Sequence, residues 1–358
     1  MGTTHLTLFI SFPPPVPYDG DEGTEGPCGT AHQLVTERLV NMAFSGTSTK
    51  KSPAPDSLSP LAARCLWDWE PRRVTALIRA HIRLGVHPDR WKTARGVAIP
   101  KPGKPDYGAA KAYRVISLLN CLGKMVEKVA AYLISNQCEC QGAFHPGQYG
   151  CRPQRSAVDA VGLAIARVQE AWSRGKITGA LLMDVSAAFS SVARGCLLRK
   201  MRNARVDKDL VRWTDSFMRD RRVIMSVDGQ DGSPWRSRPT GLPQGPPVSP
   251  VLFNLYIGEI HGAVEQRAPG CQATSFVDDA TWFVEGTSVE EVASRLEWCV
   301  EESLSWAERN VVRSEVTRAE AILLSRRKVH GKRETERSGL ETAFSPSPRR
   351  LPGGLEFG

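Results

Sequence analysis

The chain has 358 residues, of which 41% are hydrophobic and 24% are charged, and this composition excludes a wholly disordered chain. Lys and Arg number 47 against 38 Asp and Glu, so the formal net charge is +9. A basic balance fits a polyanionic partner such as nucleic acid, although many ordinary basic proteins share it. The nine scattered cysteines argue against a disulfide framework and favour a reducing compartment.

The hydropathy pattern predicts no membrane partner. No stretch of about 18 consecutive apolar residues occurs, so no transmembrane helix is expected. The apolar segment Leu6–Phe12 has no basic residues before it and runs directly into Pro13, unlike a secretory signal peptide. We therefore expect an intracellular protein, in the nucleus or the cytoplasm, that is not secreted.

The first half of the chain is predicted to be a linker followed by mostly helical structure. Residues 1–50 are rich in Gly, Pro, Ser and Thr, which is typical of a disordered or linker segment. Apolar residues then recur at helical spacing, and Ser156 with Asp159 three positions later indicates a helix start. The elements expected here are helices over 61–84, 123–137 and 156–172, and a strand over 96–100 followed by a Gly/Lys/Pro loop over 101–112.

The second half mixes strands with helices. Short apolar runs predict strands over 179–184, 223–227, 273–277, 281–284 and 319–324, and longer periodic segments predict helices over 194–203, 207–219 and 288–309. Residues 241–258 are expected to begin as a Gly/Pro loop and become an apolar helix, and residues 327–358 read as a disordered basic tail. The regular alternation of a Rossmann fold and its GxGxxG motif are both missing, so the pattern favours a mixed α+β architecture.

Acidic residues stand where two of these strands end. Asp184 closes a buried apolar strand, while Asp278 and Asp279 lie at the turn of a strand hairpin. An ionised carboxylate there is costly unless it is paired or bound to a metal. Three such carboxylates can hold two Mg²⁺ ions, the arrangement used for in-line phosphoryl transfer. The alternative is ordinary: strand ends and hairpin turns often carry a solvated Asp.

These acids lie within segments that resemble the motifs of reverse transcriptases, in the order found in that family. The matching segments are Ile99–Lys104, Ala112–Leu119, His145–Arg152, Leu182–Phe189, Gly241–Tyr256 and Ser275–Asp279. The pattern is similar to that of non-LTR (LINE-like) retrotransposons and covers roughly residues 50–326. The resemblance implies that residues 51–326 form the fingers and palm of a right-hand polymerase, a reverse transcriptase fold whose thumb is largely missing.

The resemblance also implies roles for single residues. Asp184, Asp278, Asp279 and the backbone carbonyl of Val185 would bind two Mg²⁺ ions, and Phe189 would lie under the nucleotide sugar and exclude a ribose hydroxyl. The other residues implied to contact the nucleotide are Lys101, Lys104, Arg114, Gln244, Gly245 and Arg318. The implied reaction is RNA-directed DNA synthesis, in which dNTPs are added to the 3′-hydroxyl of a DNA primer on an RNA template.

Two departures from the family pattern predict weak activity. Position 318 holds Arg where a lysine commonly donates a proton to pyrophosphate, and Arg is a poor general acid. Only about 30 low-complexity residues remain after the motif that contains this position, too few for a thumb, so we expect a truncated fragment of such an element. A non-catalytic nucleic-acid-binding relic is therefore the alternative to a polymerase, and a metal-dependent nuclease or phosphatase is a weaker third reading.

Charge distribution agrees with a nucleic-acid partner. Residues 90–128 contain nine Lys and Arg against two acids, and residues 194–222 contain ten against four. Such patches can follow a phosphate backbone. Exposed faces of helices often carry basic residues too, so the pattern supports nucleic-acid binding without proving it.

Overall fold

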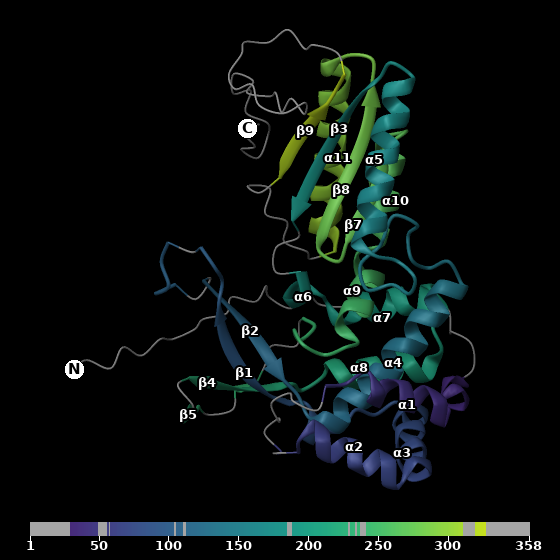
Figure 1. Cartoon of the computed structure of the whole chain (residues 1–358), viewed down its shortest axis with the longest axis vertical. Helices are drawn as coiled ribbons and strands as arrows, with labels where there is room; N and C mark the ends of the chain where they lie inside the picture. Colours follow the sequence, from purple (N-terminus) through teal and green to yellow (C-terminus); the bar gives the residue numbers. More distant parts are fainter. Residues whose placement is uncertain are drawn as a thin grey trace, which may run out of the picture. The chain divides into compact units, whose positions relative to one another are not determined.

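The computed structural model describes residues 29–48, 56, 58–103, 105–109, 112–184, 188–227, 230–232, 235–236, 241–310 and 319–326. The chain divides into two compact units, each built from two separate stretches. The first unit comprises residues 1–143 and 189–252, and the second unit comprises residues 144–188 and 253–358. The predicted mixture of helices and strands is confirmed, since both units contain a sheet and helices (Figure 1).

The first unit contains a small mixed sheet around β1 (Thr93–Pro100). Strand β1 pairs antiparallel with β2 (Tyr113–Leu118) and parallel with β4 (Arg222–Val227). Two short strands, β5 (Gln230–Asp231) and β6 (Trp235–Arg236), pair antiparallel with β4. The sequence predicted β1 and β4, and the β1–β2 pair brings the segments that contain Lys101 and Arg114 together.

Helices make up the rest of the first unit and lie together beside its strands (Figure 1). They are η1 (Ala31–Leu34), α1 (Glu37–Ser45), α2 (Pro60–Trp69), α3 (Pro71–Leu84), η2 (Asp89–Trp91), α4 (Cys121–Cys140), α7 (Arg194–Asn203) and α8 (Lys208–Met218). Apolar residues at helical spacing form the core, such as Val74, Ile78 and Ile82 of α3. No helix among the described residues is long and apolar enough to cross a membrane.

Two sequence predictions for this region are wrong. The segment 1–50, predicted to be a linker, contains α1, in which Thr36 caps the helix by accepting a hydrogen bond from the Leu39 amide and Phe44 is buried. Gly and Pro before this helix dominated the local composition and obscured it. The single helix predicted over 61–84 is two helices, because Pro71 begins α3 and cannot continue α2.

The second unit is built on a four-stranded antiparallel sheet with the strand order β7-β8-β3-β9. The strands are β7 (Gln272–Phe276), β8 (Asp279–Gly286), β3 (Ile177–Asp184) and β9 (Glu320–Leu324). All four were predicted from their apolar runs. Strand β3 lies between β8 and β9 and is nearly all apolar, as expected for a buried central strand.

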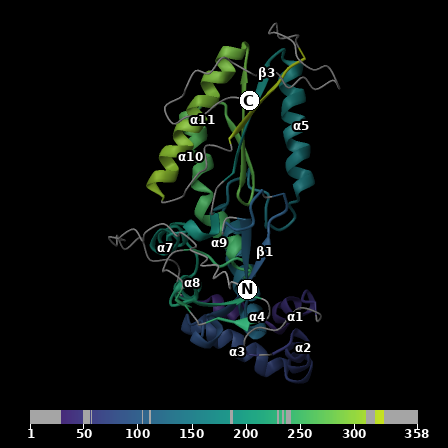
Figure 2. The same cartoon turned by 90° about the vertical axis from the view of Figure 1, so that its left-hand side faces the viewer.

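Helices cover both faces of this sheet, as the edge-on view in Figure 2 shows. Helices α10 (Glu259–Arg267) and α11 (Val289–Arg309) lie on one face, and α5 (Ala157–Ser173) lies on the other. A side chain at Gly179 would come within 2.4 Å of Val292, so this glycine allows α11 to pack closely on β3. Two short helices, α6 (Ala188–Ser191) and α9 (Ser249–Ile257), stand where the chain passes from one unit's residues to the other's.

Helix α5 carries an apolar stripe that is only partly buried. Its predicted start is confirmed, since Ser156 and Asp159 form a capping box. The stripe predicts a buried face, but Val158, Val161 and Ile165 are 80%, 59% and 53% exposed. The helix contacts the sheet mainly toward its C-terminal end, where Val168 and Ala171 are buried.

Candidate active site

The register of strands β3 and β8 brings the predicted acidic residues together. The two strands are antiparallel, and Asp184 is paired directly with Asp279. Directly paired residues share one face of a sheet with Cβ atoms about 4.5–5.5 Å apart. The predicted adjacency of the two strand ends is observed, since Asp184 and Asp279 occupy paired backbone positions of β3 and β8. Like charges at paired positions destabilise a sheet, so this pair favours a cation between them.

A tight turn with unusual backbone geometry holds the other acid. Phe276 pairs with Asp279, so only Val277 and Asp278 connect β7 to β8. Val277 has φ of 62°, in the left-handed region that a β-branched residue rarely adopts. Such a conformation costs on the order of 1–3 kcal/mol and persists only where surrounding structure enforces it.

The surrounding structure is the segment His145–Arg152, which runs beside the outer edge of β7. The Ser275 amide donates to the Gly147 carbonyl at 2.8 Å, and the Tyr149 amide donates to the Ser275 carbonyl at 2.9 Å. A Cβ at Gly150 would come within 2.5 Å of the Val277 nitrogen. Only a glycine allows this approach, so the segment braces the turn that carries Asp278.

Buried polar side chains fix this segment in place. The Gln148 side-chain amide donates to the Asn254 carbonyl at 2.8 Å and accepts from the His145 amide at 2.9 Å. The Asn254 side chain in turn donates to the Gly150 carbonyl at 2.6 Å. Arg152 donates to the His145 and Gln148 carbonyls at 2.8 and 3.1 Å. The segment is therefore held by a closed network rather than by packing alone.

Helix α10 contacts β7 through a second polar group. His261 is fully buried, and its Nε2 lies 2.8 Å from the Ser275 hydroxyl. Burial, with a smaller effect of the nearby His145, lowers the pKa of His261 to about 3, so the ring is neutral at physiological pH. A neutral imidazole can accept or donate one hydrogen bond to Ser275, three residues before Asp278.

In the first unit, the structure brings the predicted nucleotide-binding segments together. Gly245 has φ of 121°, and a Cβ there would come within 2.8 Å of the Ser117 carbonyl oxygen. The Ser117 amide donates to the Gln244 carbonyl at 3.1 Å. The loop therefore lies against β2, the strand that carries the exposed Arg114. The side chain of Gln244 is exposed.

The remaining predicted residues are placed as follows. Phe189 is half-buried in α6, and its carbonyl accepts from the Leu242 amide at 2.6 Å. Lys101 follows β1, and its amide donates to the Ala112 carbonyl at 2.7 Å. The predicted residues Lys104, Val185 and Arg318 lie outside the described residues.

The acidic residues at the ends of β3 and β8 are the candidate ligands of a metal ion. Among the described residues, no group of three or more His, Cys, Asp or Glu side chains forms a metal cluster. The paired positions of Asp184 and Asp279, with Asp278 beside them in the turn, supply carboxylate donors of the kind that Mg²⁺ prefers. The donor chemistry and the register therefore fit a divalent cation.

Several residues that shape this site were given no role from the sequence. Gln148 and Asn254 lie in segments recognised as motifs, and their side chains prove to be structural. His261 and Glu265 stand outside every motif, and no local pattern marks them. Their roles depend on contacts between residues far apart in the chain, which a single sequence does not reveal.

Comparison with known proteins agrees with this geometry. Residues 99–318, more than half of the chain, match the family model described as "Reverse transcriptase (RNA-dependent DNA polymerase)". The chain is 26% identical over 276 residues to an "RNA-directed DNA polymerase from mobile element jockey" of Drosophila funebris, covering 76% of this chain and 30% of that protein. It is 24% identical over 283 residues to a "Probable RNA-directed DNA polymerase from transposon BS" of Drosophila melanogaster, covering 77% of this chain and 30% of that protein.

The chain thus spans about 30% of the length of these two relatives. Among solved structures, a telomerase from Candida tropicalis without its C-terminal domain is similar, with a TM-score of 0.48 and 10% identity over 68% of this chain and 52% of that one. The family match includes β3, the β7–β8 hairpin and the loop at Gln244. The chain belongs to the reverse transcriptase (RNA-dependent DNA polymerase) family.

Proposed function

We propose that this chain carries the fingers and palm of an RNA-directed DNA polymerase from a non-LTR retrotransposon. The second unit is the palm, and the first unit, together with the loop at Gln244, supplies the fingers. The observation that carries the proposal is the pairing of Asp184 with Asp279 next to a two-residue turn that holds Asp278. The substrates are an RNA template, a DNA primer and dNTPs.

The acidic residues hold the metal ions in this proposal. Reverse transcriptases generally use divalent metal ions, and here Asp184, Asp278, Asp279 and the Val185 carbonyl hold two Mg²⁺. Bound Mg²⁺ activates the primer 3′-hydroxyl and neutralises charge on the phosphates. The neutral His261 and the Gly150 contact keep β7 and its turn in one position while the acids carry out this role.

Basic, aromatic and loop residues other than the acids position the nucleotide. Arg114 presents a planar guanidinium suited to bidentate contact with the triphosphate, and Lys101 and Lys104 add positive charge. Phe189 excludes a 2′-hydroxyl by its bulk. Gln244 and Gly245 face the nucleotide and template, where Gly245 allows backbone to approach closely. Arg318 adds charge near the pyrophosphate without serving as an effective acid.

Primer extension on an RNA template with Mg²⁺ tests the proposal. We expect Asp184→Asn and Asp278→Asn each to reduce extension about a thousandfold or more, because each removes several kcal/mol of metal-dependent stabilisation. Glu301→Gln, an exposed carboxylate of α11, is the matched control and should leave extension unchanged. A thermal shift caused by Mg²⁺ in the wild type and absent in the Asp184 variant provides a readout that does not depend on turnover.

Two results would contradict the proposal. One is extension by Asp278→Asn at the wild-type rate. The other is a wild-type chain that shows neither extension nor Mg²⁺ stabilisation, which would favour a non-catalytic nucleic-acid-binding protein. In an active chain, Phe189→Ala should raise ribonucleotide incorporation relative to deoxyribonucleotide incorporation, and an unchanged ratio would remove the sugar-excluding role of Phe189.

A further inference from the structure

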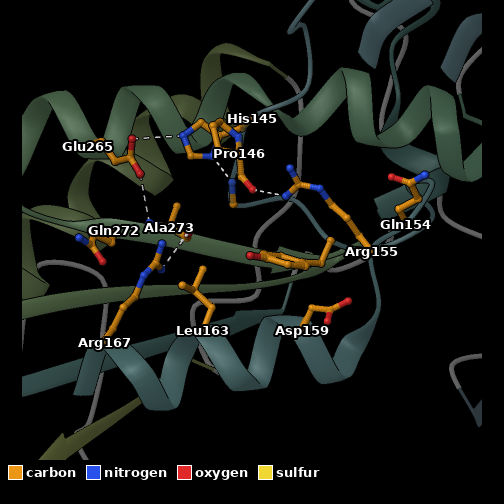
Figure 3. Close-up of a pocket in the computed structure, with 12 residues that line it drawn as sticks. His145, Pro146, Gln154, Arg155, Asp159, Leu163, Arg167, Glu265, Gln272 and Ala273 are labelled. Atoms are coloured by element: carbon orange, nitrogen blue, oxygen red, sulfur yellow. Dashed lines mark hydrogen bonds and ion pairs between the residues drawn. The ribbon is translucent and has the colours of Figure 1, made fainter. Parts of the chain in front are cut away.

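A polar pocket of about 540 Å³ lies in the second unit between α5, α10 and the edge of β7 (Figure 3). None of the three candidate metal-binding acids lines it. Its size falls within the range of about 300–1,000 Å³ typical of small-molecule sites. The side chains around it include two arginines from the start and the middle of the α5 region, Arg155 and Arg167.

Arg155 is held in place but keeps free donors. Its Nη1 donates to the carbonyls of Pro146 and Gln148, and its guanidinium carbon lies 5.1 Å from the centre of the Tyr149 ring. A guanidinium has five N–H donors in a rigid fork. No other bond from Arg155 is found among the described residues, so its Nε and Nη2 donors remain available.

Arg167 has the same character at a more buried position. Its Nη1 donates to the Thr274 hydroxyl at 2.9 Å and lies 3.4 Å from the Ala273 carbonyl. Burial lowers the pKa of Arg167 from its ordinary value, which shows that the cation is partly removed from water. Within the described part of the chain its other nitrogens have no partner, and a desolvated cation of this kind favours an anion beside it.

The two carboxylates of the pocket are already engaged. Asp159 accepts from the Ser156 amide at 2.8 Å and from the Ser156 hydroxyl at 2.7 Å. Glu265 accepts from the Ala273 amide at 3.1 Å, and its other oxygen lies 3.2 Å from His145 Nε2. Neither acid forms a close ion pair with an arginine of the pocket among the described residues, although the charge of Glu265 acts on Arg167 and opposes the lowering of its pKa by burial. The uncommitted groups in the pocket are therefore mainly cationic donors.

We propose that this pocket binds the phosphate group of a nucleotide unit, with Arg155 and Arg167 as its ligands. The planar fork of arginine matches the oxygen geometry of phosphate, and charge-assisted hydrogen bonds to phosphate are stronger than those between neutral groups. The phosphate belongs either to a free nucleotide or to a nucleic-acid strand. The site is separate from the carboxylates of the proposed polymerase and does not depend on nucleotide transfer.

Protection from chemical modification tests the site directly. The full chain is treated with phenylglyoxal, and modification of each arginine is followed by mass spectrometry without ligand, with inorganic phosphate, with AMP and with oligo(rA). We expect at least one ligand to slow modification of Arg155 and Arg167 about fivefold or more. Arg174 is the matched control, because it lies at the other end of α5, pairs with Glu285 and does not line the pocket.

The arms distinguish the source of the phosphate. Protection by AMP or inorganic phosphate indicates a free phosphate monoester, and protection by oligo(rA) alone indicates a strand phosphodiester. Both results support the site. Equal modification rates with and without all three ligands, at concentrations where binding to the chain is saturated, would overturn it.

Variants supply a second measurement. Arg155→Gln should weaken binding of the protecting ligand about tenfold, since it removes a charge-assisted hydrogen bond to phosphate. Arg155→Lys keeps the charge but loses the fork, so we expect an intermediate loss. Arg174→Gln should bind as the wild type does. Unchanged affinity in Arg155→Gln would overturn the assignment, and this variant avoids Arg167, whose removal also disturbs β7.

Discussion

Two clusters, one in each unit, bury polar side chains in opposite ways. Around β7 in the second unit, Gln148, Asn254 and Arg152 are buried, and each donates hydrogen bonds to backbone carbonyls. In the first unit, His87 and Glu127 are equally buried, yet neither nitrogen of the ring and neither oxygen of the carboxylate has a hydrogen-bond partner among the described residues. The polar groups around β7 fix backbone, whereas the side chains of His87 and Glu127 make no hydrogen bond among the described residues.

The cause lies in what surrounds each group. His87 Nε2 and Glu127 Oε1 are 3.8 Å apart, too far for a hydrogen bond, and the rings of Trp91, Trp213 and Phe217 enclose the imidazole. Burial lowers the pKa of His87 to about 2 and raises the pKa of Glu127 to about 7. Burial thus favours the neutral form of both groups, with Glu127 protonated below pH 7, whereas the groups near β7 obtain hydrogen-bond partners.

Burial also shifts the pKa of Arg221, a cation beside this cluster. Arg221 is almost fully buried, donates to the Phe217 carbonyl at 2.9 Å and lies 4.6 Å from the centre of the Phe217 ring. Burial lowers its pKa to about 10, with Glu127 opposing the shift. Arg221 therefore stays charged at neutral pH, beside a carboxyl group whose pKa is raised to about 7.

The largest effect we expect comes from disturbing the hydrogen-bonded segment beside β7. Gly150→Ala should lower the free energy of unfolding by about 3 kcal/mol, because the new Cβ would lie 2.5 Å from the Val277 nitrogen and 3.0 Å from the Phe276 carbonyl carbon, both backbone atoms. Urea denaturation measures the change. Gly162→Ala in the middle of α5 is the control, since a Cβ added there would have no neighbour within 4 Å among the described residues, and it should stabilise by about 0.5–1 kcal/mol. Equal stability of the two variants would contradict the bracing role of Gly150.

The next largest effect comes from replacing Glu127, whose buried carboxylate has no hydrogen-bond partner among the described residues. Glu127 titrates with a raised pKa when folded, near 7 against 4.5, so its favourable contribution is complete below pH 4.5 and is lost as the pH rises through 7. Glu127→Gln does not titrate. Its stability relative to the wild type should therefore increase by on the order of 3 kcal/mol between pH 4.5 and pH 8.

The measurement is urea denaturation of both proteins at a series of pH values. His87 acts in the opposite direction, because its lowered pKa means that stability is present above pH 6.5 and is lost as the pH falls. Comparing Glu127→Gln with the wild type at each pH cancels this contribution. Glu301→Gln, which removes an exposed carboxylate of α11, is measured beside it as the matched control. A flat difference for Glu127→Gln would mean that water reaches the cluster.

Local pattern was enough to predict the part of the fold that carries the acids. The apolar run before Asp184, and the turn residues between two short strands, led to β3, β7 and β8 and to their pairing. These elements are specified by alternation and by strand ends, which are readable in one sequence. The strand β2 and helix α10 were not recognised as separate elements, because each lies in a segment without a distinct period.

Contacts between distant residues could not be predicted in the same way. His87, Glu127 and Arg221 come from three separate segments, so no window of sequence shows that they meet. The apolar stripe of α5 indicates an amphipathic helix but not which neighbour covers it, and Val158 is 80% exposed. The bracing glycines were visible in the sequence, but the backbone that approaches them was not.

The smallest expected effect comes from replacing a buried threonine by valine in each unit. This comparison is the most direct test of the contrast, because the substitution and the side-chain type are the same in both places. Thr214 of α8 is fully buried, and its hydroxyl has no hydrogen-bond partner in the described part of the chain, whereas the Thr274 hydroxyl of β7 accepts from Arg167 at 2.9 Å. Valine has nearly the shape of threonine without the hydroxyl. Thr214→Val should leave the free energy of unfolding unchanged or raise it slightly, because it removes a buried hydroxyl that makes no hydrogen bond among the described residues.

Thr274→Val should instead lower the free energy of unfolding by about 1 kcal/mol, because it leaves a partly buried guanidinium donor without its nearest acceptor. Valine and threonine are both β-branched, so differences in backbone preference largely cancel in the helix and in the strand. The two variants are compared by urea denaturation at pH 7. A loss of about 1 kcal/mol or more in Thr214→Val would show that its hydroxyl has a partner, such as ordered water, and that the first unit satisfies its buried polar groups after all.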